Sequence, residues 1–439
     1  MRIVIRGGRL VDPGHLDTIA DLLIEDDKIT RIIKHSATGS IKAAAGKKIP
    51  DVRIIDAFGK IVCPGFIDMH VHLREPGHEY KETIATGCRA AVWGGFTAVC
   101  AMPNTLPVND NARITAFILK KAARANSARV YPVGAISEGI EGKRLCNFSD
   151  LKAGGAIAVS DDGRPVMDEH LMHAALRVAQ ENDLRVISHC ENLDLTANGV
   201  MNAGPVAVQM GLTGIPNASE SAMVLRDIAL SEMTGVPIHI AHVSTAESVW
   251  AIREAKSRGV PVTAETAPHY FMLTDTAVKE YGTLAKMNPP LGSDQDREAI
   301  REGLSDGTIE VIATDHAPHS GLEKNVEFNQ AANGIIGMET AISLGLKLVE
   351  EGVISITGLV EKMAIAPARI LGLKRNMRPG QTADITIIDP NIDYEVNVDR
   401  FQSLSKNCPF DRWKFSGKPV MTMVGGHVVF EEGSDEDFT

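Results

Sequence analysis

The stretch FIDMHVHLREPG, residues 66–77, carries a predicted strand into a loop and places histidines at alternate positions. An apolar run at residues 61–67 leads into it, which predicts a buried strand that ends in polar side chains. A β-strand sends residues i and i+2 to the same face, so His70 and His72 are predicted to project together. Two imidazoles at this spacing can hold one metal ion, and zinc, nickel, manganese and iron all accept nitrogen ligands.

The setting of this pair distinguishes it from two ordinary surface histidines, which are the commoner case for an isolated His-x-His. The pair follows an apolar strand, and Arg74, Pro76 and Gly77 come shortly after it in a predicted loop. Ligand-binding residues concentrate on loops that a rigid scaffold holds in place. A functional site is therefore the favoured interpretation.

Short apolar runs recur along the chain, each followed by a polar or glycine-rich loop and a helix-like segment. Strands that alternate with helices predict parallel βα units, and their number favours an α/β fold of the (β/α)8 TIM-type barrel class. A doubly wound open sheet is the alternative that periodicity leaves open. The predicted strands cover residues 66–69, 96–102, 130–135, 156–159, 185–188, 237–241, 261–264 and 309–313. The predicted helices cover residues 83–93, 113–125, 169–181, 219–234, 244–258 and 294–304, the last with Ser293 and Asp296 in capping-box spacing.

Both ends of the chain depart from this pattern, because short strand-like runs replace the strand–helix alternation. These runs are expected to pair into one small β-sandwich domain, with the barrel inserted between its two parts. The acidic end of the chain, EEGSDEDFT, predicts a disordered tail. The strand-like runs cover residues 2–6, 20–26, 28–34, 53–56, 384–388, 394–396, 420–424 and 427–431. The predicted domain bounds are residues 1–60 and 371–439 for the small β domain and residues 61–370 for the barrel.

The composition describes an ordinary globular protein and narrows the classes of partner. The 439 residues are 44% hydrophobic and 23% charged, which allows a large core. The net charge is −11 without a cluster of Lys and Arg, which argues against nucleic-acid binding. The six cysteines form no Cys-x-x-Cys pair, which favours a reducing compartment. No signal peptide or membrane span is apparent, so the cytoplasm is the predicted location.

Candidate metal ligands follow four further predicted strands. Asp161 and Asp162 lie in VSDDG, His189 closes RVISHCE, His242 closes PIHIAHVS, and Asp315 closes IEVIATD. In a barrel the carboxyl ends of the strands meet at one mouth, where barrel active sites lie. Together with the His-x-His strand, five strand ends therefore predict one shared site.

Four histidines, a bridging carboxylate and a further aspartate can hold two metal ions. Two ions that share a hydroxide lower the pKa of bound water from about 15.7 toward 7 and polarise a carbonyl. The remaining aspartate can then carry the proton, a role worth roughly 10²–10⁴ in rate. Spacing alone does not decide whether Asp161 or Asp162 bridges the ions.

Other histidines near these strand ends are weaker candidates. His239 lies at an odd position of the strand that His242 closes, so it is expected to point to the opposite face in a structural role. His269, in ETAPHY, either lines the mouth or fills a structural role. His316 follows Asp315 and is expected to point away from the site.

Together these motifs closely resemble the dihydroorotase family, and more narrowly the bacterial class I enzymes of the amidohydrolase superfamily. The His-x-His strand is common to that superfamily, whereas MPNT, NPPL and TDHAPH point to this group of enzymes. The resemblance extends through RPGQTADITIID and so covers nearly the whole chain. The motifs that carry it are FIDMHVHLREPG, GGFTAVCAMPNTLP, DDGRP, ISHCE, AHVS, ETAPHY, KMNPPLGSDQDREAI and IATDHAPH.

The resemblance implies the reversible cyclisation of N-carbamoyl-L-aspartate to L-dihydroorotate, a step of de novo pyrimidine biosynthesis. In the hydrolytic direction it implies that a metal-bridging hydroxide attacks the ring amide carbonyl, with Asp315 as general acid and base. It also implies two zinc ions, bridged by Asp162. The implied metal ligands are His70, His72, Asp162, His189, His242 and Asp315. The implied substrate-binding residues are Arg74, Asn104, Asn288 and His319.

The chemistry of the implied substrate residues agrees with an anionic substrate. Arg74 offers a planar fork to a carboxylate, and a salt bridge to Glu75 or Glu79 is the structural alternative. Asn104 and His319 add donors near the same mouth. For Asn104 the alternative role is to stabilise the turn in Pro-Asn-Thr.

Three features depart from related sequences. Many members of the superfamily bridge their metals with a carboxylated lysine, but residues 156–163 contain no lysine and Lys152 precedes the strand, so none is expected. Relatives usually have an arginine after NPPL, where this chain has Gly292. They tend to have Pro-Phe-Gly where this chain has Ala-Asn-Gly at residues 332–334, a change that bears on substrate affinity.

Two other functions stay open. Within enzymes, the alternative is another cyclic-amide hydrolase such as a hydantoinase or allantoinase, although those usually carry the bridging lysine. Outside enzymes, it is a non-catalytic scaffold subunit of aspartate carbamoyltransferase, although such relatives typically lose metal ligands and here all six positions are filled. The resemblance also suggests two protein partners, a second copy of this chain in a homodimer and aspartate carbamoyltransferase.

Overall fold

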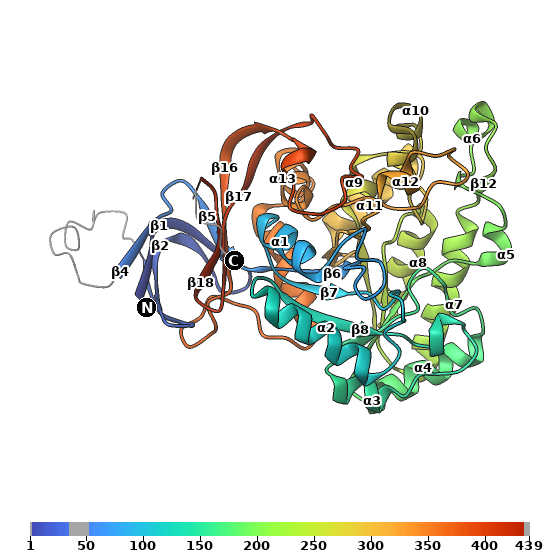
Figure 1. The fold of residues 1–439 in the computed structure, drawn as a ribbon, viewed down its shortest axis with the longest axis horizontal. Coiled ribbons are helices and arrows are strands. Elements are labelled where there is room, and N and C mark those ends of the chain that lie inside the picture. Colours follow the sequence, from blue (N-terminus) through green and yellow to red (C-terminus); the bar gives the residue numbers. More distant parts are fainter. Residues whose placement is uncertain (1, 35–51, 434–439) are drawn as a thin grey trace.

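The computed structural model describes residues 2–34 and 52–433, which two eight-stranded sheets organise (Figure 1). One sheet is parallel and surrounded by helices, and the other is mixed and contains both ends of the described chain. Residues 434–439, most of the predicted acidic tail, lie outside the described residues. Within residues 2–34 and 52–433, no helix is long and apolar enough to cross a membrane.

The parallel sheet closes into the predicted barrel. Its first strand is joined to the segment after its last strand by a parallel bridge between Val71 and His316, where the His72 N–H donates to the His316 carbonyl at 2.8 Å. This closure excludes the open doubly wound sheet. The barrel strands, in spatial order, are β6 (Phe66–Val71), β7 (Phe96–Ala101), β8 (Arg129–Gly134), β9 (Ala158–Val159), β10 (Arg185–Ser188), β13 (Ile238–Ile240), β14 (Val262–Thr266) and β15 (Val311–Ile312).

All six predicted helices are present, and the Ser293–Asp296 capping box forms with Gly307 in the left-handed conformation at the helix end. Helices predicted from sequence are α1 (Ile84–Trp93), α2 (Ala112–Ala125), α4 (Glu169–Glu181), α7 (Ala218–Thr234), α8 (Ala246–Ser257) and α11 (Asp294–Asp306). Further helices are α3 (Phe148–Gly154), α5 (Leu193–Thr196), α6 (Pro205–Met210), α9 (Pro268–Met272), α10 (Ala277–Tyr281), α12 (Gly321–Lys324), α13 (Ala341–Glu350), α14 (Ile356–Val360) and α15 (Ala366–Ile370). Short turns of other helix types are η1 (Glu138–Ile140), η2 (Gly282–Ala285), η3 (Glu361–Ile365) and η4 (Val398–Arg400), and β11 (Met201–Asn202) pairs with β12 (Gly214–Ile215).

The mixed sheet joins the two ends of the chain, as predicted for the small β domain. Its central seam is the antiparallel pairing of β5 with β16, in which Val62 faces Ile387. The strands are β1 (Arg2–Asp12), β2 (Leu16–Glu25), β3 (Lys28–Lys34), β4 (Val52–Asp56), β5 (Ile61–Pro64), β16 (Ile385–Glu395), β17 (Lys414–Val424) and β18 (His427–Glu431). The bounds of the two domains themselves stay a prediction.

The sequence suggests that the apolar run at residues 61–67 belongs to one strand, but the structure shows two. It divides at Gly65 into β5, which belongs to the mixed sheet, and β6, which begins the barrel. A Cβ atom at Gly65 would collide with the side chain of Thr97 on β7, so only glycine fits where the chain passes from one sheet to the other.

The barrel interior is apolar below its mouth. One buried cluster joins Ile67, Ala98, Val133, Ile187 and Val311, which lie on strands around the whole barrel. Side chains from opposite strands can meet only inside the barrel, so this cluster forms a dry floor. Polar residues at the strand ends therefore lie between this floor and the loops.

Candidate metal centre and active site

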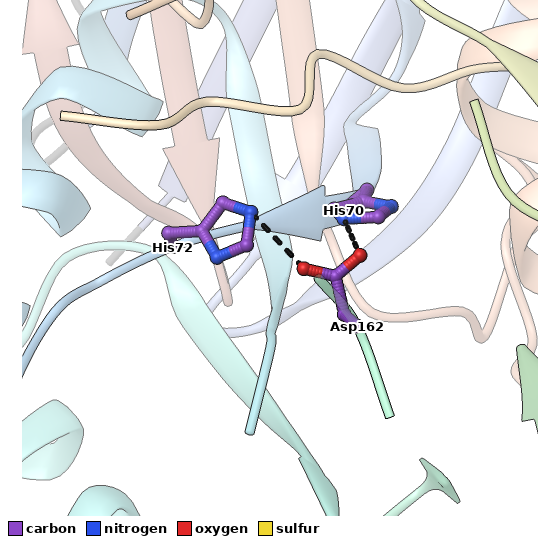
Figure 2. Close-up of side chains that lie close together, drawn as sticks. All are labelled: His70, His72 and Asp162. Atoms are coloured by element: carbon purple, nitrogen blue, oxygen red, sulfur yellow. Dashed lines mark ion pairs between the residues drawn. The ribbon is translucent and has the colours of Figure 1, made fainter. Parts of the chain in front are cut away.

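Two histidines from the end of β6 face one carboxylate (Figure 2). His70 Nε2 lies 3.2 Å from Asp162 Oδ1, and His72 Nε2 lies 3.5 Å from Asp162 Oδ2. All three side chains are buried, and their ligand-type atoms lie within 4.8 Å of one another. The strand alternation in FIDMHVHL thus brings both rings to the carboxylate that follows β9.

A second pair of histidines approaches the same carboxylate. Asp162 Oδ1 lies 3.5 Å from His189 Nδ1 and 3.7 Å from His242 Nε2, and these two nitrogens are 2.7 Å apart. Asp162 is therefore common to two groups of three side chains that can each hold a metal ion. This is the arrangement that a bridging carboxylate requires.

Asp315 completes the cluster from the end of β15. Its Oδ1 lies 3.1 Å from His72 Nε2 and 3.6 Å from His70 Nε2. The backbone is left-handed at Arg74, His242 and Asp315, with φ of 60°, 32° and 49°. Non-glycine residues rarely adopt this conformation, and it collects where a site demands a particular side-chain direction.

The structure distinguishes Asp161 from Asp162. The Asp161 carboxylate turns away from the histidines and accepts the backbone N–H groups of Ile136 and Ser137 at 2.8 and 3.0 Å, together with the Ser137 hydroxyl. Burial raises the pKa of Asp161 to about 6 despite these bonds. Asp161 therefore ties the loop after β8 to the end of β9, and of these two neighbouring aspartates it is Asp162 that faces the rings.

The donors fit metal ions. His70 Nε2 is buried and lies 3.2 Å from Asp162 Oδ1, but it forms no well-aligned hydrogen bond within the described chain, an arrangement that is costly unless another group satisfies the nitrogen. His189 Nδ1 and His242 Nε2 approach so closely that a proton or a cation must lie between them. Imidazole nitrogens with carboxylate oxygens are a donor set that zinc accepts.

The charges around the cluster also suit a cation. Burial lowers the pKa of His189, but its hydrogen bonds to Asp162 and Glu191 outweigh this and raise the pKa to about 9. Burial raises the pKa of Asp162, but His70 and the other rings hold it well below the usual range of a carboxyl. In the ion-free protein, protons on the rings thus balance the charge of the buried carboxylates.

Glu265 is a residue of the candidate site that the sequence analysis missed. From β14, its Oε1 lies 2.7 Å from His70 Nδ1 and its Oε2 lies 3.2 Å from His239 Nε2. Contact with the outer nitrogen leaves the inner nitrogen of His70 directed at the cluster. The available signal was a charged residue at the end of a predicted strand, in VTAET.

The prediction that His239 faces away from the site is wrong. It lies in register with Ile187 and Thr263 on the interior side of the sheet and contacts Glu265. The odd–even rule fails because β13 ends at Ile240, and the left-handed backbone at His242 resets the alternation. The expected structural role remains, since His239 supports the carboxylate that orients His70.

Glu191 is the second missed residue. Its Oε2 lies 3.0 Å from His189 Nε2 and accepts a hydrogen bond from Asn288 Nδ2 at 3.0 Å, while Oε1 accepts one from Thr196 at 2.9 Å. Glu191 therefore joins a candidate metal ligand to a candidate substrate residue. Its signal was the spacing of two from His189 in SHCE, equal to that of the His-x-His pair.

Asn104 directs its side chain at the cluster rather than into its own turn. Its Oδ1 lies 2.8 Å from His72 Nδ1, and its Nδ2 donates to Asp162 Oδ2 at 3.1 Å. The turn is instead closed by Thr105, whose hydroxyl donates to the Pro107 carbonyl at 2.8 Å.

Arg74 is buried without an ion pair to its neighbouring glutamates. Its Nε donates to the Pro318 carbonyl at 3.1 Å, and Nη2 lies 3.3 Å from His319 Nε2. Glu75 instead pairs with a lysine, and Glu79 accepts a backbone N–H within its own loop. Burial lowers the pKa of Arg74 to about 10, so the guanidinium remains a cation at neutral pH.

His319 lies beside Arg74 as a neutral imidazole. Burial and the cations Arg74 and Lys81 lower its pKa to about 2. Its Nε2 lies 2.8 Å from the carbonyl of Asn333, to which it donates. The segment Ala-Asn-Gly at residues 332–334, which differs from the Pro-Phe-Gly of relatives, thus contacts the site through a main-chain carbonyl.

The remaining candidates lie where their sequence positions indicated. His316 contacts Glu82 at 3.4 Å and points away from the ligands, as predicted. His269 is buried near the mouth, where burial lowers its pKa to about 4. The Lys152 ammonium lies at the surface, 2.6 Å from the Asp183 carbonyl. A Cβ atom at Gly292 would come within 2.7 Å of the Asp296 side chain.

Comparisons with known proteins agree with this geometry. Residues 59–248 match a family model described as dihydro-orotase-like. The dihydroorotase of Syntrophus aciditrophicus is 51% identical over 98% of this chain and 100% of its own length. That of Geotalea daltonii is 53% identical over 98% of this chain and 99% of its own.

Solved structures of hydantoinases share the architecture. The L-hydantoinase from Arthrobacter aurescens superimposes with a TM-score of 0.86 at 25% identity, over 98% of this chain and 96% of its own. The D-hydantoinase from Thermus sp. gives 0.83 at 26% identity, over the same shares. The hydantoinases therefore share the fold, whereas the dihydroorotases also share about half of the residues along nearly the whole chain.

Proposed function

The chain belongs to the dihydroorotase family of cyclic amide hydrolases, and on that premise we propose that it is a zinc-dependent enzyme that interconverts N-carbamoyl-L-aspartate and L-dihydroorotate. The observation that carries this proposal is the position of Asp162, which has histidine nitrogens within 3.2 to 3.7 Å on both carboxylate oxygens. A carboxylate so placed can bridge two ions. The reaction belongs to pyrimidine biosynthesis.

We propose that two zinc ions are held by six side chains, with Asp162 shared between them. When bound, the ions would polarise the ring amide carbonyl and acidify the water that attacks it. Glu265, Asn104 and Glu191 hold the outer nitrogens of three of the rings, which keeps the rings directed at the ions. The proposed ligands are His70, His72, Asp162, His189, His242 and Asp315.

Asp315 is the proposed general acid and base. Burial raises its pKa, but the surrounding histidines outweigh this and keep the carboxyl ionised, so it can accept a proton. In hydrolysis, an O–C bond forms at the ring carbonyl while Asp315 takes a proton from the attacking water. The C–N bond then breaks, and Asp315 returns that proton to the departing nitrogen, which leaves N-carbamoyl-L-aspartate.

Arg74 is proposed to bind the carboxylate of the substrate, and His319, whose Nε2–H donates to the Asn333 carbonyl, is proposed to line the same pocket. The buried Arg74 guanidinium forms no ion pair with a carboxylate of the described chain, so a bound anion would supply its counter-charge. Asn104 contacts His72 and Asp162, and Asn288 contacts Glu191 next to His189. Both amides can pair with the polar edge of the ring.

The proposal is tested by measuring the zinc-dependent interconversion of the two compounds by purified protein, with Asp315→Asn as the matched variant. Turnover that disappears in Asp315→Asn while zinc stays bound would support both the substrate and the proton carrier. Hydantoin and allantoin serve as competing substrates, because the hydantoinase fold is shared. Bound zinc without turnover of dihydroorotate would refute the proposal, and would favour either another cyclic amide or the scaffold alternative.

A further inference from the structure

Residues 401–408, FQSLSKNC, lie between η4 and β17 in the C-terminal part of the chain, yet they are bonded to the barrel. Glu339, which lies just before α13, accepts the backbone N–H groups of Gln402 and Ser403 at 2.7 and 3.2 Å. Glu82, in the loop after β6, accepts the N–H of the next residue at 3.1 Å. Two carboxylates thus fix this segment, which we call the strap, against the loops of the mouth.

Asn407 is the strap residue that reaches two of those loops at once. Its Nδ2 donates to the carbonyls of Ala317 and Gly334 at 2.9 and 3.1 Å. Its Oδ1 accepts the His319 N–H at 3.1 Å, and its own carbonyl accepts the Ile336 N–H at 3.0 Å. The side chain is buried, and all three of its hydrogen-bonding positions in this arrangement are used by main-chain groups.

The two loops that Asn407 joins, residues 317–319 and 334–336, border the part of the proposed site where Arg74 and His319 lie. Residues 317–319 follow Asp315 and His316 and end in His319, whose ring donates to the Asn333 carbonyl at 2.8 Å. The loops also meet through the Ala317 N–H, which donates to the Ile335 carbonyl at 2.7 Å. The spacing between the His319 ring and Arg74 therefore depends on how these loops are held together.

We propose that Asn407 is a positioning residue for substrate binding: it fixes the His319 loop against residues 334–336, so that the anion pocket is formed before substrate arrives. This inference rests on the proposed function, since it assigns Asn407 a part in the same site. None of its four hydrogen bonds involves a candidate metal ligand. Its loss should therefore weaken the binding of substrate and leave the chemistry at the metal cluster largely intact.

Asn407→Asp is the sharpest variant, because it keeps the shape and the acceptor for His319 but removes both donated hydrogen bonds. Asn407→Ala removes all three side-chain bonds. The matched control is Asn397→Ala, at an asparagine of the same region whose side chain, within residues 2–34 and 52–433, accepts only the nearby Asp399 N–H, at 3.0 Å. KM for dihydroorotate, kcat and zinc content are measured for each folded variant.

Both Asn407 variants are expected to raise KM about tenfold, with kcat within about twofold of the parent and zinc content unchanged. Asn397→Ala should match the parent in all three. A folded Asn407→Asp enzyme with unchanged KM would overturn the inference, as would a parallel loss of kcat and zinc. If Asn407→Ala does not fold, Asn407→Asp decides alone.

The parent enzyme separates this inference from the proposed function. A parent that binds zinc but does not turn over dihydroorotate would overturn both. A parent that is active, with a KM that rises in His319→Ala but not in the Asn407 variants, would refute only the role of Asn407.

Discussion

The Nδ1 atom of His70 lies 2.7 Å from Oε1 of Glu265, and both side chains are buried. The contact fixes the orientation of the ring, so that Nε2 is directed at Asp162. The same carboxylate holds His239 through its second oxygen. A candidate metal ligand is thereby oriented by a residue that the sequence analysis did not select.

Glu265→Gln is expected to lower metal affinity about 10- to 100-fold, because the neutral amide holds the His70 ring less firmly and makes it less basic. The measurement is a zinc titration against a competing chelator. Glu339→Gln serves as the control, since Glu339 is also a carboxyl side chain that accepts hydrogen bonds, but it binds the strap and not the histidines. Equal affinities in Glu265→Gln and the parent would show that Glu265 does not orient the ligand.

Zinc affinity is expected to rise with pH up to about 9. The pKa of His189 in the ion-free protein is raised to about 9, because its bonds to Asp162 and Glu191 outweigh the effect of burial. Below that pKa the ring carries a proton that a metal ion must displace, so affinity falls as pH falls. Chelator competition at several pH values between about 6.5 and 9 measures the slope. An affinity independent of pH would contradict the protonation of the ring.

Arg74→Lys is expected to raise KM for dihydroorotate about tenfold or more, because an ammonium replaces two parallel N–H donors with a point charge. Activity should remain at high substrate concentration, since the metal ligands are untouched. Steady-state kinetics check this, with Arg89→Lys on the exposed face of α1 as the control. An unchanged KM in Arg74→Lys would remove Arg74 from the anion pocket.

Glu339→Gln is expected to flatten the pH dependence of stability. Burial raises the pKa of Glu339 from its usual 4.5 to about 8, although the backbone N–H groups of Gln402 and Ser403 oppose the shift. A raised pKa contributes stability that is present below about 4.5 and is lost as pH rises through about 8. Thermal unfolding of the two proteins between about pH 5 and 8.5 should therefore differ in slope, the parent losing more. Parallel curves would mean that Glu339 does not titrate in this range.

Much of the fold was predictable because the apolar runs and the helical patterns alternate clearly along the chain. All eight barrel strands and six helices were placed within a few residues. The division at Gly65 was not predictable, since the run at residues 61–67 is apolar on both sides of it. Only the position of Thr97 on a neighbouring strand requires glycine there.

The candidate ligands that directly follow barrel strands were predictable from the sequence. The rule that strand ends converge brought His189, His242 and Asp315 to one mouth. It could not separate Asp161 from Asp162, because the choice depends on which carboxylate the N–H groups of the loop after β8 capture. Hydrogen bonds between residues that are distant in the sequence could not be predicted for the same reason.

Asn407 shows how far such contacts lie from any motif. It is 88 residues beyond His319, in a segment between a short turn and a strand, and nothing in SKNC indicates a catalytic neighbourhood. Glu265 and Glu191 do lie inside quoted motifs, ETAPHY and ISHCE, but each contacts the outer nitrogen of a histidine ring. Sequence patterns reveal ligands more readily than the residues that hold them.

The seam between β5 and β16 has a consequence for how the protein is made. A ribosome releases β1 to β5 first, and β16 emerges only after the whole barrel, from residue 385 onward. Until then the backbone of β5 on that side has no partner strand, and an open edge of an apolar strand invites pairing with other chains. Nascent chains and fragments that stop before residue 385 are thus the aggregation-prone forms of this protein, and completing translation is what seals the edge.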